Sequence, residues 1–356
     1  MTSVRPSPAY FAAANSSDGF YSRFPALFDP YSGRWQKIYI IKGGPGTGKS
    51  SFMKRAAEVA EQKGYLVERY YCSADPQSLD GIRIPARGIA LLDGTAPHTV
   101  DAVYPGAVEE IINLGMFFDA RVLREKSEEI RALCTEHAGL HAKARRYLHA
   151  AGTVRENQQS LLSDAFLAEK TAGAAARIVK KIPQEREPVS DMQFVTAISV
   201  RGIVHLQTAE TLGGCVYVTG GGRAAHFFSA LIAAAETRGV SYVRYASPLC
   251  PAETEGVYFP GIDTVYMTDR YGYAADGART VTQTLNTARF YDKERLSRIR
   301  SRIRFARTCE ELLLDGACES LRAAGQVHDT LEAHYIAAMD FDAMHAFTER
   351  FLRAFC

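Results

Sequence analysis

The sequence lacks the cysteine patterns that bind zinc or build a disulfide framework. Its seven cysteines form no C-x-x-C pair, and no cysteine and histidine follow a zinc-site spacing. An odd number of cysteines without a framework is typical of reduced thiols in a cytosolic protein. We therefore predict no disulfides and a cytoplasmic location.

Long apolar runs and a strong excess of one charge are also missing. The longest apolar stretch, 224–235, is interrupted by His226 and Ser229 and is too short to span a bilayer. The net charge is only +2, which gives no strong attraction to nucleic acid or acidic membranes. The six arginines within 293–307 fall on more than one helical face, as on a solvated helix. We expect neither a membrane nor a nucleic acid as partner.

One stretch carries a complete phosphate-loop signature, G-x-x-x-x-G-K-[ST]. A β-branched run at 38–41 precedes it and a helical pattern at 52–63 follows it, the context that distinguishes a true phosphate loop from a chance match. Backbone N–H groups of such a loop, together with the positive end of the next helix, surround polyphosphate oxygens. The predicted nucleotide-binding residues are Gly43, Gly44, Pro45, Gly46, Thr47, Gly48, Lys49, Ser50 and Ser51.

The signature assigns roles to individual side chains and predicts ATP with Mg²⁺ as the bound species. Lys49 is expected to reach the β- and γ-phosphates, and the Ser50 hydroxyl to ligate Mg²⁺. Ile89 to Asp93 is an apolar run that ends in a carboxylate, the shape of a Walker B strand. We therefore predict Ser50 and Asp93 as metal ligands, and Lys49 and Asp93 as catalytic residues.

Three further polar residues follow predicted strands. Asp75 and Asp80 come after the strand-like segment 66–72, at the edge where open α/β sheets bind ligands, so both are expected to face the nucleotide or an acceptor. Asp75 is predicted as a further catalytic residue, as is His98. The alternative for Asp75 is a helix cap ahead of Pro76. His98 lies just past the Walker B strand and is predicted to orient a water or sense the γ-phosphate. Its alternative is a loop histidine bonded to the backbone.

A long helical region follows, from about 107 to 182. Gly152 is expected to stop a first helix, and the capping box from Thr153 to Glu156 to start a second one. The prediction is an antiparallel helical hairpin, with an equivalent at about 280–340. It would serve either as a lever or partner-binding arm for another protein, or as a packed extension of the domain.

The second half of the sequence repeats the first. Phe11 and Gly19 return as Phe194 and Gly202. Further along, Gly64 returns as Gly239, and this pair has an offset of 175 (239 − 64). This predicts a tandem duplication with domains at 1–188 and 189–356.

The second copy lacks the charged groups of the first. At the same offset, Lys49, Ser50 and Asp93 correspond to Ala224, Ala225 and Thr268. Three charge-handling groups are therefore absent, and we expect a catalytically silent half. Its glycines at 220–222 and the neighbouring Arg223 leave phosphate binding there open.

Taken together, segments 11–21, 43–51, 88–98 and 104–115 resemble a family of bacterial P-loop ATPases, mostly from Firmicutes, that have two P-loop halves. The resemblance covers nearly the whole chain and implies nucleotide binding and a P-loop fold. Members of that family often keep a usable second loop, and this chain departs from them at 220–225.

The predicted fold class is α/β, with two tandem P-loop NTPase-like domains, each a parallel sheet flanked by helices and carrying a helical hairpin. The leading functional hypothesis is ATP hydrolysis in the first half, coupled to motion of the hairpin. One alternative is a phosphotransferase in which Asp75 or Asp80 holds a small acceptor. Another is a nucleotide-gated binding module.

Overall fold

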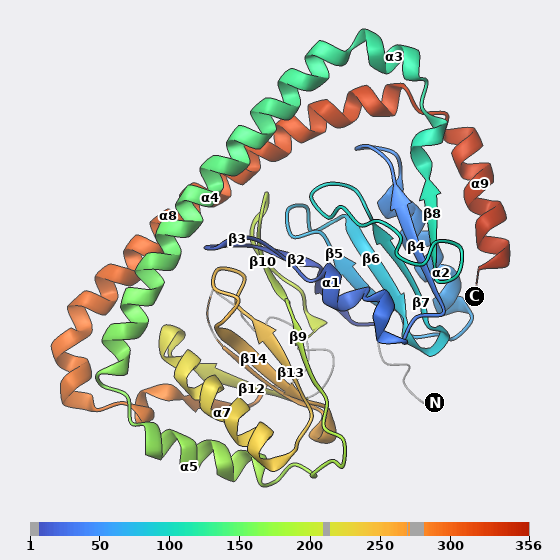
Figure 1. Cartoon of the computed structure of the whole chain (residues 1–356). Helices are drawn as coiled ribbons and strands as arrows, with labels where there is room; N and C mark the ends of the chain where they lie inside the picture. Colours follow the sequence, from blue (N-terminus) through green and yellow to red (C-terminus); the bar gives the residue numbers. More distant parts are fainter. Residues whose placement is uncertain (1–6, 209–213, 269, 271–280, 356) are drawn as a thin grey trace.

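The chain builds two sheets that lie along a pair of long helices (Figure 1). The computed structural model describes residues 7–208, 214–268, 270 and 281–355. Among these residues, no helix combines the length and the apolar character needed to cross a membrane. The six cysteines that they include are all unpaired.

The first sheet has six strands in the order β1-β5-β6-β7-β4-β8. Neighbouring strands are parallel except β6, which runs antiparallel to both of its neighbours. The strands are β1 (Ala9–Phe11), β4 (Lys37–Lys42), β5 (Glu68–Tyr71), β6 (Leu79–Ile84), β7 (Ile89–Asp93) and β8 (Glu109–Asn113). Short helices α1 (Phe24–Leu27), η1 (Pro30–Ser32), η2 (Pro85–Arg87) and η3 (Leu114–Phe117) connect them.

The second sheet repeats this topology strand for strand, in the order β9-β13-β14-β15-β12-β16, with β14 antiparallel to its neighbours. Two parallel-rich sheets flanked by helices confirm the mixed α/β class. The strands are β9 (Ser190–Gln193), β12 (Gly214–Thr219), β13 (Tyr242–Ala246), β14 (Thr254–Phe259), β15 (Thr264–Thr268) and β16 (Val281–Asn286). The short helices are η4 (Gly221–Arg223), η5 (Pro260–Ile262) and η7 (Thr287–Phe290).

The halves meet through two small hairpins, β2–β3 (Ala13–Ser16, Gly19–Ser22) and β10–β11 (Thr196–Ser199, Gly202–His205). Next to them, the Ser17 amide donates to the Leu249 carbonyl at 2.8 Å, and the Val200 amide donates to the Ala74 carbonyl at 3.0 Å. These two bonds join equivalent positions of the two halves. Such reciprocal contacts are the mark of a two-fold interface, here formed within one chain.

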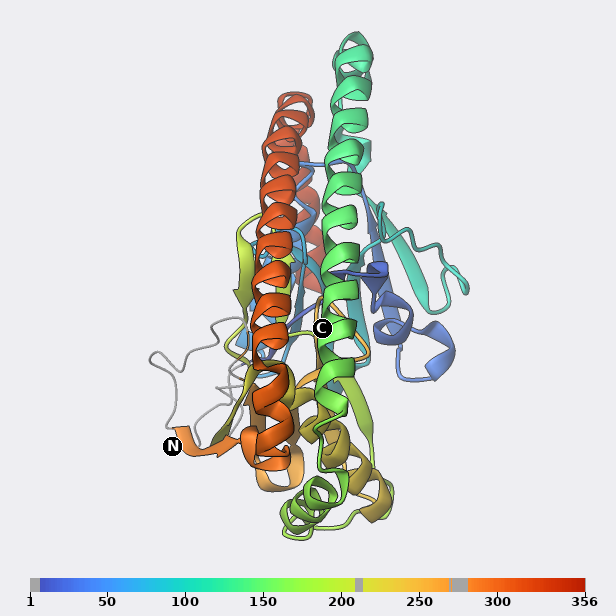
Figure 2. The same ribbon diagram turned by 90° about the vertical axis from the view of Figure 1, so that its left-hand side faces the viewer.

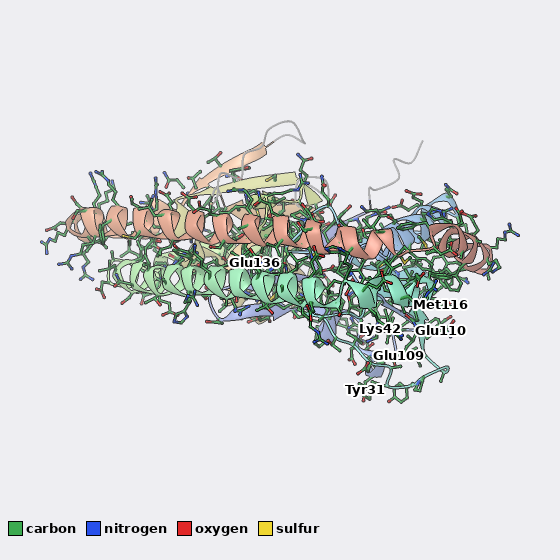
Figure 3. All side chains as sticks on the ribbon, turned by 90° about the horizontal axis from the view of Figure 1, so that it is seen from above. Tyr31, Lys42, Glu109, Glu110, Met116 and Glu136 are labelled. Atoms are coloured by element: carbon green, nitrogen blue, oxygen red, sulfur yellow. The ribbon has the colours of Figure 1, made fainter. Side chains whose placement is uncertain are left out.

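Two long helices lie side by side and antiparallel along both sheets, as Figures 2 and 3 show from two directions. They are α4 (Ser127–Ser163), which follows the short α3 (Ala120–Glu125), and α8 (Lys293–Ala337). The hairpins predicted at 107–182 and 280–340 are therefore wrong, because each region contributes one long helix that pairs with the helix of the other half.

Gly152 does not stop α4. A Cβ there would lie 2.3 Å from the Cβ of Ser17, so the glycine lets the helix approach the β2–β3 hairpin closely. The Thr153 hydroxyl donates to the His149 carbonyl inside the helix, at 3.2 Å, and caps nothing. A helical glycine costs only about 1 kcal/mol, which the packing of this long helix outweighs.

Each long helix carries the chain into the other half. After α4, α5 (Ala168–Val179) packs on α7 (Ala224–Arg238) in the core of the second sheet. After α8, α9 (Phe341–Ala354) packs on α2 (Lys49–Gln62) in the core of the first. The two spatial units therefore do not coincide with residues 1–188 and 189–356.

Candidate phosphate-binding site

The signature lies between a strand and a helix at the carboxyl edge of the first sheet. β4 ends at Lys42 and α2 begins at Lys49, with the loop between them. β7 runs parallel beside β4 and places Asp93 opposite Ile41, next to the start of the loop. The Lys42 ammonium (Figure 3) donates to the Gly94 carbonyl at 2.8 Å, which ties the segment after β7 to the base of the loop.

Glycine is required at several points of this loop. Gly46 and Gly48 have φ values of 67° and 79°, in the left-handed region that side chains disfavour. A Cβ at Gly43 would lie 2.6 Å from the Thr47 hydroxyl oxygen. That buried hydroxyl donates to the Gly44 carbonyl at 2.9 Å and closes the turn from within.

No side chain caps the N-terminus of α2. Its N-cap residue is Gly48, and its first turn contains no acidic residue. The amides of the first turn have no intrahelical partners, and the helix dipole makes this end positive. The geometry therefore suits an anion.

The Lys49 ammonium is folded onto the loop. It donates to the Gly44 carbonyl at 2.8 Å and to the Gly43 carbonyl at 3.2 Å, and it lies 3.6 Å from a carboxylate oxygen of Asp93. The Lys49 side chain is 13 % exposed. The positive charge is thus held where the loop, the helix end and the β7 carboxylate converge.

Of the two predicted magnesium ligands, Ser50 follows this lysine in α2 and Asp93 pairs with it. The Ser50 hydroxyl oxygen accepts from the Leu79 amide at 2.9 Å, and Asp93 accepts from the amide of Thr95 at 2.9 Å. A hydroxyl and a carboxylate fit Mg²⁺, which usually takes one or two protein ligands together with phosphates and water. The described residues contain no cluster of three or more His, Cys, Asp or Glu ligands, and such a Mg²⁺ site does not need one.

His98 lies in a buried pocket of the N-terminal segment. Its ring stacks on Phe24 with centroids 4.1 Å apart, its Nε2 is 3.2 Å from a carboxylate oxygen of Asp80, and its Nδ1 is 3.4 Å from the Ser22 hydroxyl. Burial raises the pKa of Asp80, and the bond with His98 opposes that rise. Because both ring nitrogens of His98 face protein groups, its contacts give no support to a catalytic role. The alternative, a histidine bonded to the backbone, is not what the structure shows either, because both ring nitrogens contact side chains.

Asp75 is exposed and closes a turn. Its carboxylate accepts from the Gln77 amide at 3.2 Å, and the neighbouring Ala74 carbonyl takes part in the interface with the second half. The alternative of a helix cap is therefore wrong, because no helix begins at Pro76 and the carboxylate closes a turn. Neither Asp75 nor the buried Asp80 has contacts that would suit the binding of an acceptor.

The sequence did not predict that the end of α8 covers the loop. A Cβ at Gly46 would lie 2.7 Å from Ile336 and 2.9 Å from the Cγ of Glu332, and one at Gly44 would lie 2.9 Å from the Tyr335 ring. Nearly 300 residues separate the two sides of this contact (332 − 46 = 286). No local pattern identifies it, because it depends on the exchange of helices between halves.

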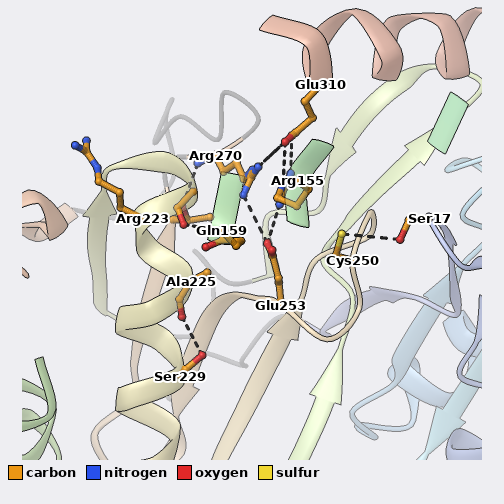
Figure 4. Close-up of polar contacts among 12 residues, drawn as sticks. Ser17, Arg155, Gln159, Arg223, Ala225, Ser229, Cys250, Glu253, Arg270 and Glu310 are labelled. Atoms are coloured by element: carbon orange, nitrogen blue, oxygen red, sulfur yellow. Dashed lines mark hydrogen bonds and ion pairs between the residues drawn. The ribbon is translucent and has the colours of Figure 1, made fainter. Parts of the chain in front are cut away.

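The equivalent loop in the second half is shorter and bonded in place. Four residues, 220–223, join β12 to α7, against the six of 43–48 in the first half. The Gln159 amide of α4 donates to the Gly222 carbonyl at 3.0 Å, and Arg223 donates to the Gly220 carbonyl at 3.2 Å (Figure 4). Arg223 is thus engaged by its own loop.

No family model, curated protein or solved structure matches this chain. The candidate site therefore stands on its own residues and geometry.

A buried charge network lies close to the second loop, between the long helices and β14 (Figure 4). The fully buried Arg155 donates to Glu310 at 2.6 and 2.8 Å and to Glu253 at 2.8 Å, and Arg270 pairs with Glu310 at 3.0 Å. Burial raises the pKa of the nearby Glu255 to about 7. The sequence did not predict this network, since its members come from four separate elements or connections.

Proposed function

We propose that the chain is a P-loop nucleoside triphosphatase that binds ATP with Mg²⁺ in its first half, at residues 43–51. The position of the Lys49 ammonium carries the proposal. It lies at an uncapped helix N-terminus, within a glycine loop and beside the Asp93 carboxylate. A cytoplasmic location belongs to the same proposal.

In this proposal, the residues act by positioning and charge. The loop amides and the end of α2 hold the phosphates, and Lys49 moves from the carbonyls of Gly43 and Gly44 onto the β- and γ-phosphate oxygens. Ser50 and Asp93 would hold Mg²⁺, which neutralises the charge that builds up on those oxygens. Little covalent work by the protein is needed.

A nucleotide-gated binding module is the second candidate. The contact between α8 and the loop favours it, because a ligand at the loop would act directly on a helix that reaches the other half. In this second candidate function, hydrolysis is slow and only returns the protein to its unbound conformation.

Phosphate release from ATP by the purified chain tests the proposal. We expect steady release that needs Mg²⁺ and no added acceptor. Lys49→Ala should lower turnover by about 100- to 1000-fold, as the loss of one charge-stabilising donor does in other enzymes. Lys143→Ala, on the exposed face of α4, is the matched control and should leave turnover unchanged.

Tight binding with negligible turnover would favour the binding module. Wild-type turnover in the Lys49→Ala variant would refute the site.

A further inference from the structure

The last turns of α8 belong to the second half of the sequence and lie on the phosphate loop of the first. Glu332 and Ile336 contact Gly46, and Tyr335 contacts Gly44. Here the positive φ of Gly46 and its lack of a side chain both permit the close approach. The loop and this helix therefore share one surface.

These contacts are van der Waals contacts. Among the described residues, no hydrogen bond joins Glu332, Tyr335 or Ile336 to residues 43–48. Over the second loop, the position equivalent to Glu332 is held by Gln159 of α4 (332 − 159 = 173). Gln159 does bond its loop, at the Gly222 carbonyl. Within the described part of the chain, α8 thus contacts the first loop without hydrogen bonds, whereas α4 bonds the second loop.

Glu332 also places a negative charge beside a site suited to polyanions. Its Cγ lies on Gly46, and its carboxylate oxygens are two bonds further along. Two like charges several ångströms apart in partly hydrated protein repel by about 1 to 2 kcal/mol. At the silent loop the corresponding residue is the neutral Gln159, so the charge occurs only at the loop that keeps Lys49.

We propose that Glu332 and the last turns of α8 form a gate on the nucleotide site, which a bound triphosphate displaces. This inference rests on the proposed function, since it requires nucleotide at residues 43–51. The repulsion lowers the affinity of the closed state, and binding moves the end of α8 away from the loop.

The movement would reach the rest of the first domain. The Ala338 carbonyl accepts from the Asp119 amide at 2.7 Å, and the Phe117 carbonyl accepts from the Asp340 amide at 2.9 Å. These bonds tie the α8–α9 junction to the start of α3. The gate therefore couples nucleotide binding to both long helices, through a packed two-state contact of the kind that switching requires.

Equilibrium binding of a fluorescent ATP analogue with Mg²⁺ tests the gate. Glu332→Gln keeps the shape of the side chain and removes its charge, so we expect affinity to rise by about 5- to 30-fold. Glu319→Gln, at an exposed position of the same helix, is the control and should bind like the wild type. Hydrogen exchange should become faster at 328–338 when the nucleotide binds and stay unchanged at 300–312.

The results distinguish failure of the gate from failure of the proposed function. Wild-type binding with equal affinities for both variants, or with exchange at 328–338 unchanged or slower, overturns the gate and leaves the proposed function standing. Absence of binding by all three proteins overturns the proposed function, and the gate with it.

Discussion

The two loops of this chain occupy equivalent positions in the fold and differ in the groups that surround them. Around the first, Lys49 and Asp93 supply charge, and α8 covers the loop with Glu332, Tyr335 and the apolar Ile336. At the second loop the residue equivalent to Ile336 is Ser163, which bonds to His226 at 3.1 Å. The first loop thus has an ammonium and a carboxylate beside it, whereas the carbonyl groups of the second loop accept hydrogen bonds from the side chains of Gln159 and Arg223.

A similar contrast occurs between the two ends of the long helix pair. Arg155 and Glu310 form a buried ion pair on the side of the second half. Their equivalents at an offset of 173 are His328 and His137 (328 − 155, 310 − 137), whose rings lie 5.7 Å apart. One end of the helix pair therefore holds a closed network of charges, whereas the equivalent position at the other end holds two histidine rings, and burial lowers the pKa of His137.

The largest expected effect is at the buried ion pair. Arg155→Met removes the guanidinium and leaves Arg270 as the remaining cation that the described residues place on Glu310 and Glu253, so we expect the unfolding free energy to fall by about 3 to 5 kcal/mol. Urea unfolding measures this. Arg298→Met removes the exposed partner of Glu294 and should cost less than about 1 kcal/mol. Equal losses in the two variants would show that the network does not stabilise the fold.

The next effect compares the buried carboxyls of the two halves. Glu255 and Asp80 are equivalent (255 − 80 = 175), but among the described residues a histidine pairs with Asp80 and none pairs with Glu255. The folded-state pKa of Glu255 is about 7, above its ordinary value of 4.5. The folded state therefore keeps this proton longer than the unfolded state does, and stability falls as pH rises from about 4.5 to 7.

Replacing Glu255 by glutamine should remove that loss. Relative to the wild type, Glu255→Gln should gain roughly 3 kcal/mol in unfolding free energy between pH 5 and pH 8. Denaturant midpoints measured across this range check it. Curves for the two proteins that run parallel would contradict the burial argument.

The smallest effect concerns the histidines between the helices. Burial and the neighbouring His137 lower the pKa of His141 to about 4, so its folded form stays neutral while the unfolded form takes up a proton below about 6.5. Stability should therefore fall as pH drops from 6.5 to 4.

In the second half the position equivalent to His141 is Leu314 (314 − 141 = 173). His141→Leu should flatten the acid limb by about 1 to 2 kcal/mol, a reduced figure because the site is partly hydrated. Thermal unfolding at pH 4.5 and pH 7 measures the difference. An unchanged acid limb would show that His141 is already protonated in the folded chain.

The sequence predicted the elements that short local patterns define. The strand, loop and helix around Lys49, the strand ending at Asp93 and the repeat of the second half all follow from short motifs and their spacing. β6 was not predicted, because Asp80 and Gly81 are poor strand residues and the buried carboxylate depends on His98 from a later loop. The exchange of α4 and α8 was not predicted either, since Gly152 signals a helix end locally and only long-range packing overrides it.

The number of nucleotides bound per chain is the most direct test of the contrast between the loops. Equilibrium dialysis with ATP and Mg²⁺ should give one nucleotide per wild-type chain and none for Lys49→Ala. Two nucleotides per chain, or binding that survives Lys49→Ala, would show that the charge of the first loop does not determine where the phosphate binds.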